Sequence, residues 1–439
     1  MSKFEELREQ YKEFVYKGYE VELGDKCHIR YEFEIPGLAV FYPEWEFPVM
    51  RNVDKKLLER LVFNLGMVEC ISYYKCTCPK KVKVLCGKLS KENKLWWKKL
   101  FYNGLGEFMY INGIDISEDE LLTIEADEEY EEPYKDTRKY EGCLVPVGGG
   151  KDSVVSLELL KNEKVLTYHI NYGSAIREVI DAYDSKEGDY YAVRTLSPRM
   201  LELNREGYLN GHTPFSAIVA FSSVIAAYLS GRKYIVLSNE TSANETTVKD
   251  SFVNHQYSKS FEFEEDFADY FKGITDSDIH YFSLLRPLAE IQIAALFSKY
   301  NEFHHIFRSC NAGSKKGIWC CNCPKCLFVY IILLPFIPEN ELIGIFGEKL
   351  LDKESLDSDF RKLTGIEENK PFECVGTRKE VLVALKEFIL KGGRSLLTDR
   401  YRDVILNEKD TLEHMLSGWV SENNVPLEYQ NILKESLEN

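Results

Sequence analysis

The sequence predicts an α/β protein built on a doubly wound parallel sheet, with an N-terminal α+β domain and a helical C-terminal region. From residue 143 onward, segments typical of strands alternate with segments typical of helices. A run of three glycines joins the first of these strands to the first helix. Strand–helix alternation is typical of parallel sheets covered by helices, and such sheets bind ligands at the carboxyl ends of their strands.

The elements of this sheet follow from short apolar runs and the residues that bound them. A long helix is expected to begin at Pro214, because Thr213 is a good N-cap and Gly231 is typical of the residue after a helix end. Another helix is expected over 153–160. The expected strands are residues 144–147, 165–170, 190–196, 234–237, 281–285 and 304–307.

The first part of the chain mixes both patterns. Strands are expected over 31–40 and 47–50, and helices over 54–65 and 92–105. Residues 118–141 are rich in Asp and Glu, and because such runs are usually solvated, we interpret them as a linker. The expected domains are 1–117 (N-terminal α+β domain), 118–141 (acidic linker), 142–338 (α/β domain) and 339–439 (helical C-terminal region).

The composition argues against several classes of protein. The 439 residues include 55 Lys and Arg against 71 Asp and Glu, which gives a net charge of −16. Nucleic acids are bound mainly through neutralised phosphates, so we expect no nucleic-acid partner. The two most apolar runs, 215–229 and 327–337, are shorter than the ~20 residues of a membrane-spanning helix. The polar N-terminus lacks the apolar core of a signal peptide, so we expect a cytoplasmic protein without a membrane partner.

The glycine run is the clearest binding motif. It comprises Gly148, Gly149, Gly150, Lys151, Asp152 and Ser153, between a strand and a helix. Glycines let the backbone approach an anion closely, and a helix start directs its N–H groups toward it. The loop is not a Walker A motif, and the third glycine of a dinucleotide fingerprint falls on Ser153. Taken alone, the loop fits a phosphate cradle or a tight turn.

A group of cysteines predicts a metal site. Cys320, Cys323 and Cys326 form a C-x₂-C-x₂-C run, and Cys310 precedes it. Four thiolates suit tetrahedral zinc, and closed four-cysteine sites are structural. An iron–sulfur cluster and free thiols are the alternatives. We expect structural Zn²⁺ at these four residues, with Cys321 outside the site.

The glycine loop resembles the pyrophosphate loop, S-G-G-x-D-S, of the ATP pyrophosphatases. The resemblance implies a HUP-like domain and an enzyme that splits ATP between the α and β phosphates and transfers AMP. It implies that Gly149, Gly150 and Ser153 cradle pyrophosphate and that Asp152 lies near Mg²⁺. The chain departs from this pattern at Gly148, which replaces the first serine. A similar cysteine cluster binds zinc in 7-cyano-7-deazaguanine synthase.

Six further strings narrow the resemblance to one family. They are FNLGMVECISYYKCTCP (63–79), LWWKKLFYNGLGEFMYINGI (95–114), VPVGGGKDSVVSLELL (145–160), LNGHTPFSAI (209–218), CNCPKCLFV (321–329) and KPFECVG (370–376). Together they resemble the ATP-dependent UDP-N-acetylmuramoyl-L-alanyl-L-glutamate epimerases of bacterial peptidoglycan synthesis. The resemblance implies conversion of the terminal L-Glu of the UDP-muramoyl dipeptide to D-Glu, with release of AMP and diphosphate.

The implied chemistry explains why an epimerase would use ATP. Removing the proton beside a free carboxylate places a second negative charge on the same group, whereas adenylation removes the first charge. A base and an acid on opposite faces, or one group that reaches both, must then move the proton. The candidates are His212, Cys374 and Glu373, together with Lys151 and Asp152 in the loop. The alternatives are a helix-capping role for His212 and buried packing for Cys374.

Three residues at expected strand ends are candidates for contacts with ATP or Mg²⁺. Asn239 and Glu240 follow one strand and have a solvated loop as the alternative. Asn171 follows another, where related enzymes place adenine contacts. The sequence does not rank Arg194, Arg199 and Arg286 as ligands of the UDP diphosphate.

Three other functions stay open at this point. The first is a different adenylating enzyme, such as an amide- or nitrile-forming synthase related to 7-cyano-7-deazaguanine synthase. The second is a tRNA-modifying transferase, which the charge of −16 disfavours. The third is a nucleotide-binding regulatory protein without catalysis, supported only by Gly148. The oligomeric state stays open as well.

Overall fold

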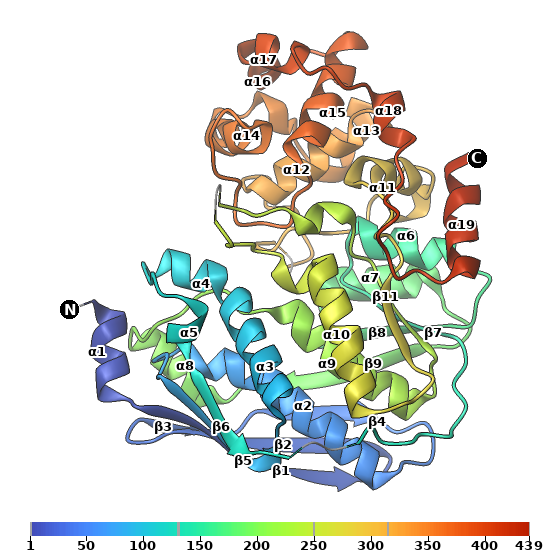
Figure 1. Ribbon diagram of the computed structural model, residues 1–439. Coiled ribbons are helices and arrows are strands. Elements are labelled where there is room, and N and C mark those ends of the chain that lie inside the picture. Colours follow the sequence, from blue (N-terminus) through green and yellow to red (C-terminus); the bar gives the residue numbers. More distant parts are fainter. Residues whose placement is uncertain (1, 130–131, 249–250, 314–315, 439) are drawn as a thin grey trace. The chain divides into compact units, whose positions relative to one another are not determined.

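A computed structural model describes residues 2–129, 132–248, 251–313 and 316–438 (Figure 1). The protein is α/β, with a large mixed sheet and many helices. It divides into two compact units. The first comprises Met1–Leu144, Tyr190–Ile235 and Phe252–Tyr281; the second comprises Val145–Asp189, Val236–Ser251 and Phe282–Asn439. The consecutive domains expected from the sequence stay a prediction.

The first unit contains antiparallel and parallel strands in the order β9-β4-β2-β1-β5-β6, with β3 beside β2. β1 runs antiparallel to β2 and parallel to β5. Side chains alternate between buried and exposed along β2, as expected of a strand with one covered face. The strands are β1 (Glu13–Leu23), β2 (Lys26–Ile35), β3 (Ala39–Phe41), β4 (Glu44–Pro48), β5 (Lys81–Lys88), β6 (Thr123–Asp127) and β9 (Asp189–Thr195).

α2 (Lys55–Tyr74) is a 20-residue helix that lies beside the strands of the first unit (Figure 1). Asp54 caps α2, because its carboxylate accepts the N–H groups of Lys56 and Leu57 at 2.9 and 3.3 Å. α2 is buried along most of its length, since it packs against α9 and against β1 and β2. The helices are α1 (Lys3–Gln10), α2 (Lys55–Tyr74), α3 (Lys91–Gly104), α4 (Gly106–Ile111), α5 (Glu118–Leu121), α8 (Pro198–Arg205), α9 (Phe215–Ser230) and α10 (Phe261–Ile274).

Four further strands carry the alternating pattern. They are β7 (Cys143–Pro146), β8 (Val165–Ile170), β10 (Tyr234–Leu237) and β11 (His280–Ser283), in the order β11-β10-β7-β8. β7 and β10 are parallel, as the strand–helix alternation predicts. The expected parallel sheet is nevertheless wrong as a description of the whole, because the antiparallel β1, β2 and β4 make the sheet mixed.

The second unit is helical after β11 in the part of the chain that the structure describes, as expected for the C-terminal region. α12 packs against α14 and α15, and α11 packs against α6. The helices are α6 (Lys151–Leu159), α7 (Ser174–Tyr183), α11 (Glu290–Phe297), α12 (Pro324–Leu333), α13 (Glu339–Phe346), α14 (Asp357–Thr364), α15 (Arg378–Leu390), α16 (Leu396–Arg400), α17 (Arg402–Leu406), α18 (Leu412–Leu416) and α19 (Leu427–Glu438). None of the helices described is both long and apolar enough to cross a membrane.

Most expected elements exist, but the strand expected over 31–40 is divided by a turn between β2 and the antiparallel β3, and the strand expected over 304–307 is wrong. Residues 304–307 form a turn, in which the buried His304 contacts the carboxylate of Glu341 at 2.7 Å. A run of four residues has too little periodicity to separate a strand from a turn. α9 ends as expected at Gly231, which has a φ of 79°, but it begins one residue late, at Phe215.

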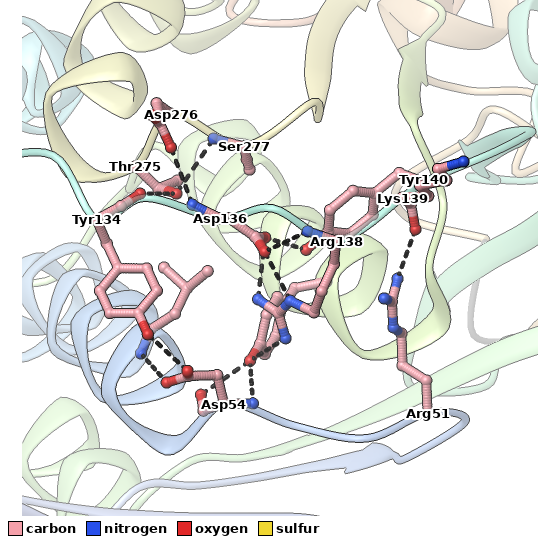
Figure 2. A network of polar contacts seen from close by, with 12 residues as sticks. Arg51, Asp54, Tyr134, Asp136, Arg138, Lys139, Tyr140, Thr275, Asp276 and Ser277 are labelled. Atoms are coloured by element: carbon pink, nitrogen blue, oxygen red, sulfur yellow. Dashed lines mark hydrogen bonds and ion pairs between the residues drawn. The ribbon is translucent and has the colours of Figure 1, made fainter.

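The acidic stretch after residue 117 contains regular structure. α5 and β6 lie within it, and β6 pairs with β5. Figure 2 shows how the following residues are fixed to the first unit: Tyr134 donates its hydroxyl to Asp54 at 2.5 Å, and Asp136 binds the guanidinium of Arg138 through two oxygens. Polar contacts thus hold residues 134–140 against the start of α2.

Candidate functional site

The glycine loop lies between β7 and α6 in the second unit. Gly149 has a φ of +79°, and a Cβ there would lie 3.0 Å from the backbone of Ala175. A Cβ on Gly150 would lie 2.7 Å from the hydroxyl of Ser309. Gly149 therefore requires glycine, and a side chain at Gly150 would displace Ser309. Gly148 differs, because a Cβ there would meet no described atom within 4 Å.

The start of α6 has the character of an anion site. Gly150 is its N-cap, and among the described residues no side chain caps the helix. The first N–H groups of a helix lack intrahelical partners and favour negative charge. The hydroxyl of Ser153 donates to the carbonyl of Gly150 at 2.9 Å, which tightens the turn. Backbone N–H groups and the helix start thus fit a phosphate group.

Lys151 is buried beneath this loop, and its ammonium contacts the carboxylates of Asp152 and Glu290. Burial acts to lower the pKa of Lys151, but the charges and hydrogen bonds of these two carboxylates outweigh it and raise that pKa. The side chain of Asp152 is 31% exposed, whereas those of Lys151 and Glu290 are 1% and 3% exposed. Asp152 is therefore the most exposed member of this group.

Glu240 lies close to the same group of charges. Burial, followed by the neighbouring carboxylates of Glu290 and Glu380, raises the pKa of Glu240 to about 8. Its side chain accepts the N–H of Ser242, and its carbonyl accepts from Arg286 at 2.7 Å. At neutral pH Glu240 therefore holds a proton in the structure as it stands.

The other expected strand-end residues are also in the second unit. Asn239 donates its amide to the hydroxyl of Ser283 at 3.1 Å. Asn171 follows β8 directly and has a φ of 55°, a left-handed conformation that asparagine tolerates better than most residues. The loops after β7, β8 and β10 thus carry the glycine loop and the strand-end candidates, all within one unit.

The cysteines at 310, 320, 323 and 326 are brought together. Their sulfur atoms lie within 4.8 Å of one another, and those of Cys323 and Cys326 are 3.5 Å apart. Backbone N–H groups of Gly313 and Cys320 point to the sulfur of Cys310, at 3.2 and 3.4 Å. Such N–H contacts stabilise thiolates, so the donor set fits a tetrahedral zinc ion.

Cys321 is directed away from this cluster. Its thiol donates to the carbonyl of Phe346 at 3.1 Å, and it has a φ of 53°. Glu373 and Cys374 lie in the same unit. The carboxylate of Glu373 accepts from Asn311 at 2.8 Å, and the carbonyl of Cys374 accepts from Lys325.

His212 belongs to the first unit, where it forms a second group of polar side chains. Its Nδ1 lies 3.6 Å from a carboxylate oxygen of Glu107, and the Nδ1 of His255 contacts the same oxygen. The two imidazole rings are 4.5 Å apart between centroids. Burial, followed by the charge of His255, lowers the pKa of His212 to about 4, so its imidazole is neutral at neutral pH.

Two of the three arginines considered as ligands of the UDP diphosphate are hydrogen-bonded to other groups of the protein. Arg194 forms three hydrogen bonds with the buried carboxylate of Glu69, the shortest at 2.8 Å. Arg286 is buried and bound to the carbonyl of Glu240. Arg199 is more exposed, although it pairs with Glu202 on α8 and with Glu206, the residue after α8.

Two family models match the sequence. The MurL N-terminal domain matches residues 5–284, and the MurL C-terminal domain matches residues 306–396. The chain belongs to the MurL family. The glycine loop falls within the match to the MurL N-terminal domain, and the four clustered cysteines fall within the match to the MurL C-terminal domain.

Three curated proteins similar to this MurL chain are named UDP-N-acetyl-alpha-D-muramoyl-L-alanyl-L-glutamate epimerase. The protein of Xanthomonas oryzae pv. oryzae is 34% identical over 73% of this chain and 72% of its own length. The protein of Micromonospora sp. is 35% identical over 75% and 74%. The protein of Salinispora tropica is 34% identical over 75% and 73%. No solved structure matches the chain significantly.

Sequence reasoning missed two residues of the group around His212. Glu107 and His255 also lie within the MurL N-terminal match, but each is a single residue in its own segment, far from His212 along the chain. No spacing pattern connects them, because α4 and the loops before α9 and α10 meet only in the folded unit.

Proposed function

We propose that this chain catalyses the ATP-dependent epimerisation of the terminal L-Glu of UDP-N-acetylmuramoyl-L-alanyl-L-glutamate to D-Glu. The observation that carries the proposal is the similarity to the three curated epimerases over about three-quarters of each chain. On this basis the protein is an isomerase that acts on a small-molecule precursor of peptidoglycan.

The proposed reaction begins by activating the terminal glutamate. Its α-carboxylate attacks the α-phosphorus of ATP, which forms an acyl-adenylate and releases diphosphate. The activated carbonyl no longer carries the negative charge of the carboxylate, so the adjacent α-proton becomes easier to remove. A proton is then returned to the opposite face, and water hydrolyses the acyl-adenylate to release AMP and the D-Glu product.

We propose that the glycine loop binds ATP in a HUP-like pyrophosphate-loop domain. The backbone N–H groups of Gly149 and Gly150 and the uncapped start of α6 would hold the phosphates. Gly148 would contribute backbone alone, and Ser153 would hold the shape of the turn through Gly150. Lys151 would hold the loop in place through its contacts with Asp152 and Glu290.

Asp152 is the residue that we assign to Mg²⁺, because its carboxylate lies at the loop and is partly exposed. Carboxylate and phosphate oxygens are ligands that Mg²⁺ prefers, and the ion would neutralise charge on the phosphates. Glu240 and Asn239 after β10, and Asn171 after β8, would complete the nucleotide site. Binding of a cation near Glu240 would favour its ionised form.

We propose that Cys310, Cys320, Cys323 and Cys326 hold a structural zinc ion. The cluster joins the start of α12 to the loop that precedes it. A closed set of four thiolates leaves no position for substrate, so the ion would stabilise this part of the second unit without entering the reaction.

Three side chains are candidates for moving the α-proton: His212, Glu373 and Cys374. His212 is neutral and 28% exposed, and its pKa of about 4 makes it a weak base at neutral pH. Glu373 and Cys374 are the candidates in the second unit. Their order of importance is a question for variants of each residue assayed under single-turnover conditions.

The experiment that tests the proposal follows AMP and diphosphate release from ATP and Mg²⁺, with and without the UDP-muramoyl dipeptide, together with chiral analysis of the glutamate. The proposal expects AMP only with the dipeptide, accompanied by D-Glu. AMP without inversion would instead indicate another adenylating enzyme, such as an amide- or nitrile-forming synthase. Inversion without AMP would contradict the adenylation step alone.

A further inference from the structure

Three side chains from separate segments of the first unit converge on one point. Glu107 comes from α4, His212 from the loop before α9 and His255 from the loop before α10. One ligand atom from each lies within 4.8 Å of the other two. We propose that these three residues bind a divalent transition-metal ion, at a site distinct from the cysteine cluster.

The backbone around His212 is held in place for this arrangement. The buried ammonium of Lys75 donates to the side chain of Asn210 at 2.7 Å and to the carbonyl of Gly211 at 2.8 Å. Gly211 packs against Phe108, since a Cβ there would lie 3.1 Å from that ring. Phe108 neighbours Glu107 in sequence, so this close approach sets His212 beside the carboxylate.

The end of α4 makes a second contact with the loop before α9. Asn112, the residue after α4, donates its amide to the carbonyl of Asn210 at 3.1 Å. The segment that carries Glu107 and the segment that carries His212 are therefore joined by this hydrogen bond and by the packing of Gly211 against Phe108. A site whose ligands are fixed in this way needs little rearrangement when an ion binds.

The two histidines lie at different distances from the carboxylate of Glu107. The contact between His255 and Glu107 is a direct hydrogen bond or ion pair. His212, however, directs its Nδ1 to the same oxygen from 3.6 Å, beyond the length of a hydrogen bond. A pairwise contact accounts for one histidine but not for two imidazole nitrogens that point to one oxygen.

The donor set and its burial specify the class of ion. Two imidazoles and one carboxylate suit Zn²⁺, Fe²⁺ or another first-row divalent ion rather than Mg²⁺ or Ca²⁺. The side chains of Glu107 and His255 are each 10% exposed, and that of His212 is 28% exposed. Three protein ligands leave further coordination positions, and the exposed side of His212 gives access to them.

The test measures bound metal in the full-length protein. Each purified variant is stripped with a chelator, reloaded with Zn²⁺, passed through a desalting column and analysed by plasma mass spectrometry. We expect His212→Gln, His255→Gln and Glu107→Gln each to bind one equivalent less than the wild type. This difference does not depend on whether the cysteines hold an ion. His28→Gln is the matched control, because His28 is partly exposed on β2 in the same unit, and it should match the wild type.

Cobalt distinguishes the two kinds of site in the unaltered protein. Co²⁺ bound by thiolates shows an intense sulfur-to-metal charge-transfer band, whereas Co²⁺ bound by nitrogen and oxygen shows only weak d–d absorption. The proposal expects a second equivalent of Co²⁺ that adds d–d absorption without increasing the charge-transfer band. Equal metal content in the wild type and all three variants, or cobalt bound only by thiolates, would overturn it. Because this measurement needs no variant, a folding defect cannot obscure the result.

Discussion

Lys151, at the start of α6, and Glu290, at the start of α11, form an ion pair whose side chains are only 1% and 3% exposed. The pair links the start of α6, directly after the glycine loop, to the start of α11 in the same unit. Glu290 also lies among the carboxylates of Glu240 and Glu380, which interact with it electrostatically. The charge of Lys151 therefore offsets part of the repulsion within a buried acidic group.

We expect Glu290→Gln to destabilise the protein by about 1–3 kcal/mol, because the buried charge of Lys151 would keep only the partly exposed Asp152 as its partner. The measurement is the free energy of unfolding in urea. Lys151→Met combined with Glu290→Leu should recover much of the loss, since no buried charge then remains unpaired. Glu158→Gln, on the same α6, is the control. A double variant that is as unstable as Glu290→Gln would contradict this account of the pair.

Glu240 should make stability depend on pH. Its pKa in the folded protein, about 8, lies above the ordinary value of 4.5, so the protonated form favours folding. This contribution is complete below about pH 4.5 and declines as the pH rises to about 8. Glu240→Gln, which imitates the protonated carboxyl, should lose less stability than the wild type over this interval. If the unfolding free energies of the wild type and of Glu240→Gln change with pH at the same slope, Glu240 has an ordinary pKa and this account is wrong.

Two neighbouring glycines should respond differently to substitution. Gly148→Ser introduces the hydroxyl of the pyrophosphate-loop pattern into open space, so we expect normal stability and unimpaired AMP formation. Gly149→Ala should cost about 1 kcal/mol or more, because alanine is strained at a φ of +79° and would press on Ala175. Thermal unfolding and AMP release measure both effects. Equal behaviour of the two variants would argue against the described loop geometry.

The zinc assignment has a matched pair of variants within one segment. Cys326→Ser should lose the zinc equivalent of the cysteine cluster and lower the unfolding temperature, because three thiolates remain around the ion. Cys321→Ser should keep that zinc, since its side chain contacts the carbonyl of Phe346 and lies outside the cluster. Metal analysis after desalting decides between them. Loss of zinc from both variants, or from neither, would refute the four-residue ligand set.

The elements with clear boundary residues were predictable from sequence. α9 ends at Gly231 as expected, and β8 has the expected bounds. α2 was predicted too short, since it continues from residue 65 to Tyr74. It is buried on nearly all sides, so its apolar residues show no helical period that would mark the end.

The pairing of the strands was harder to predict from the sequence than the helices and strands themselves. The alternation after residue 143 predicts parallel pairing, and β7 and β10 show it. No local signal in β4 reveals that it pairs antiparallel with β9, because strands distant in the sequence choose partners through tertiary packing. The mixed character of the sheet follows from such pairings.

The residues of the candidate sites also differ in whether the sequence predicts them. The glycine loop and the cysteine run are continuous motifs, and the structure brings their members together. Glu290 and Glu380 reach the loop only through folding, from helices far along the chain. Glu107 and His255 reach His212 by the same means, and single residues of this kind carry no signal in one sequence.

The most direct test of the proposed epimerisation is incorporation of deuterium at the glutamyl α-carbon during turnover in D₂O with ATP, Mg²⁺ and the UDP-muramoyl dipeptide. The account predicts D-Glu that carries deuterium at the α-carbon, with AMP formed in step with it. Turnover of ATP that leaves the glutamate as L-Glu with its original α-hydrogen would contradict the account.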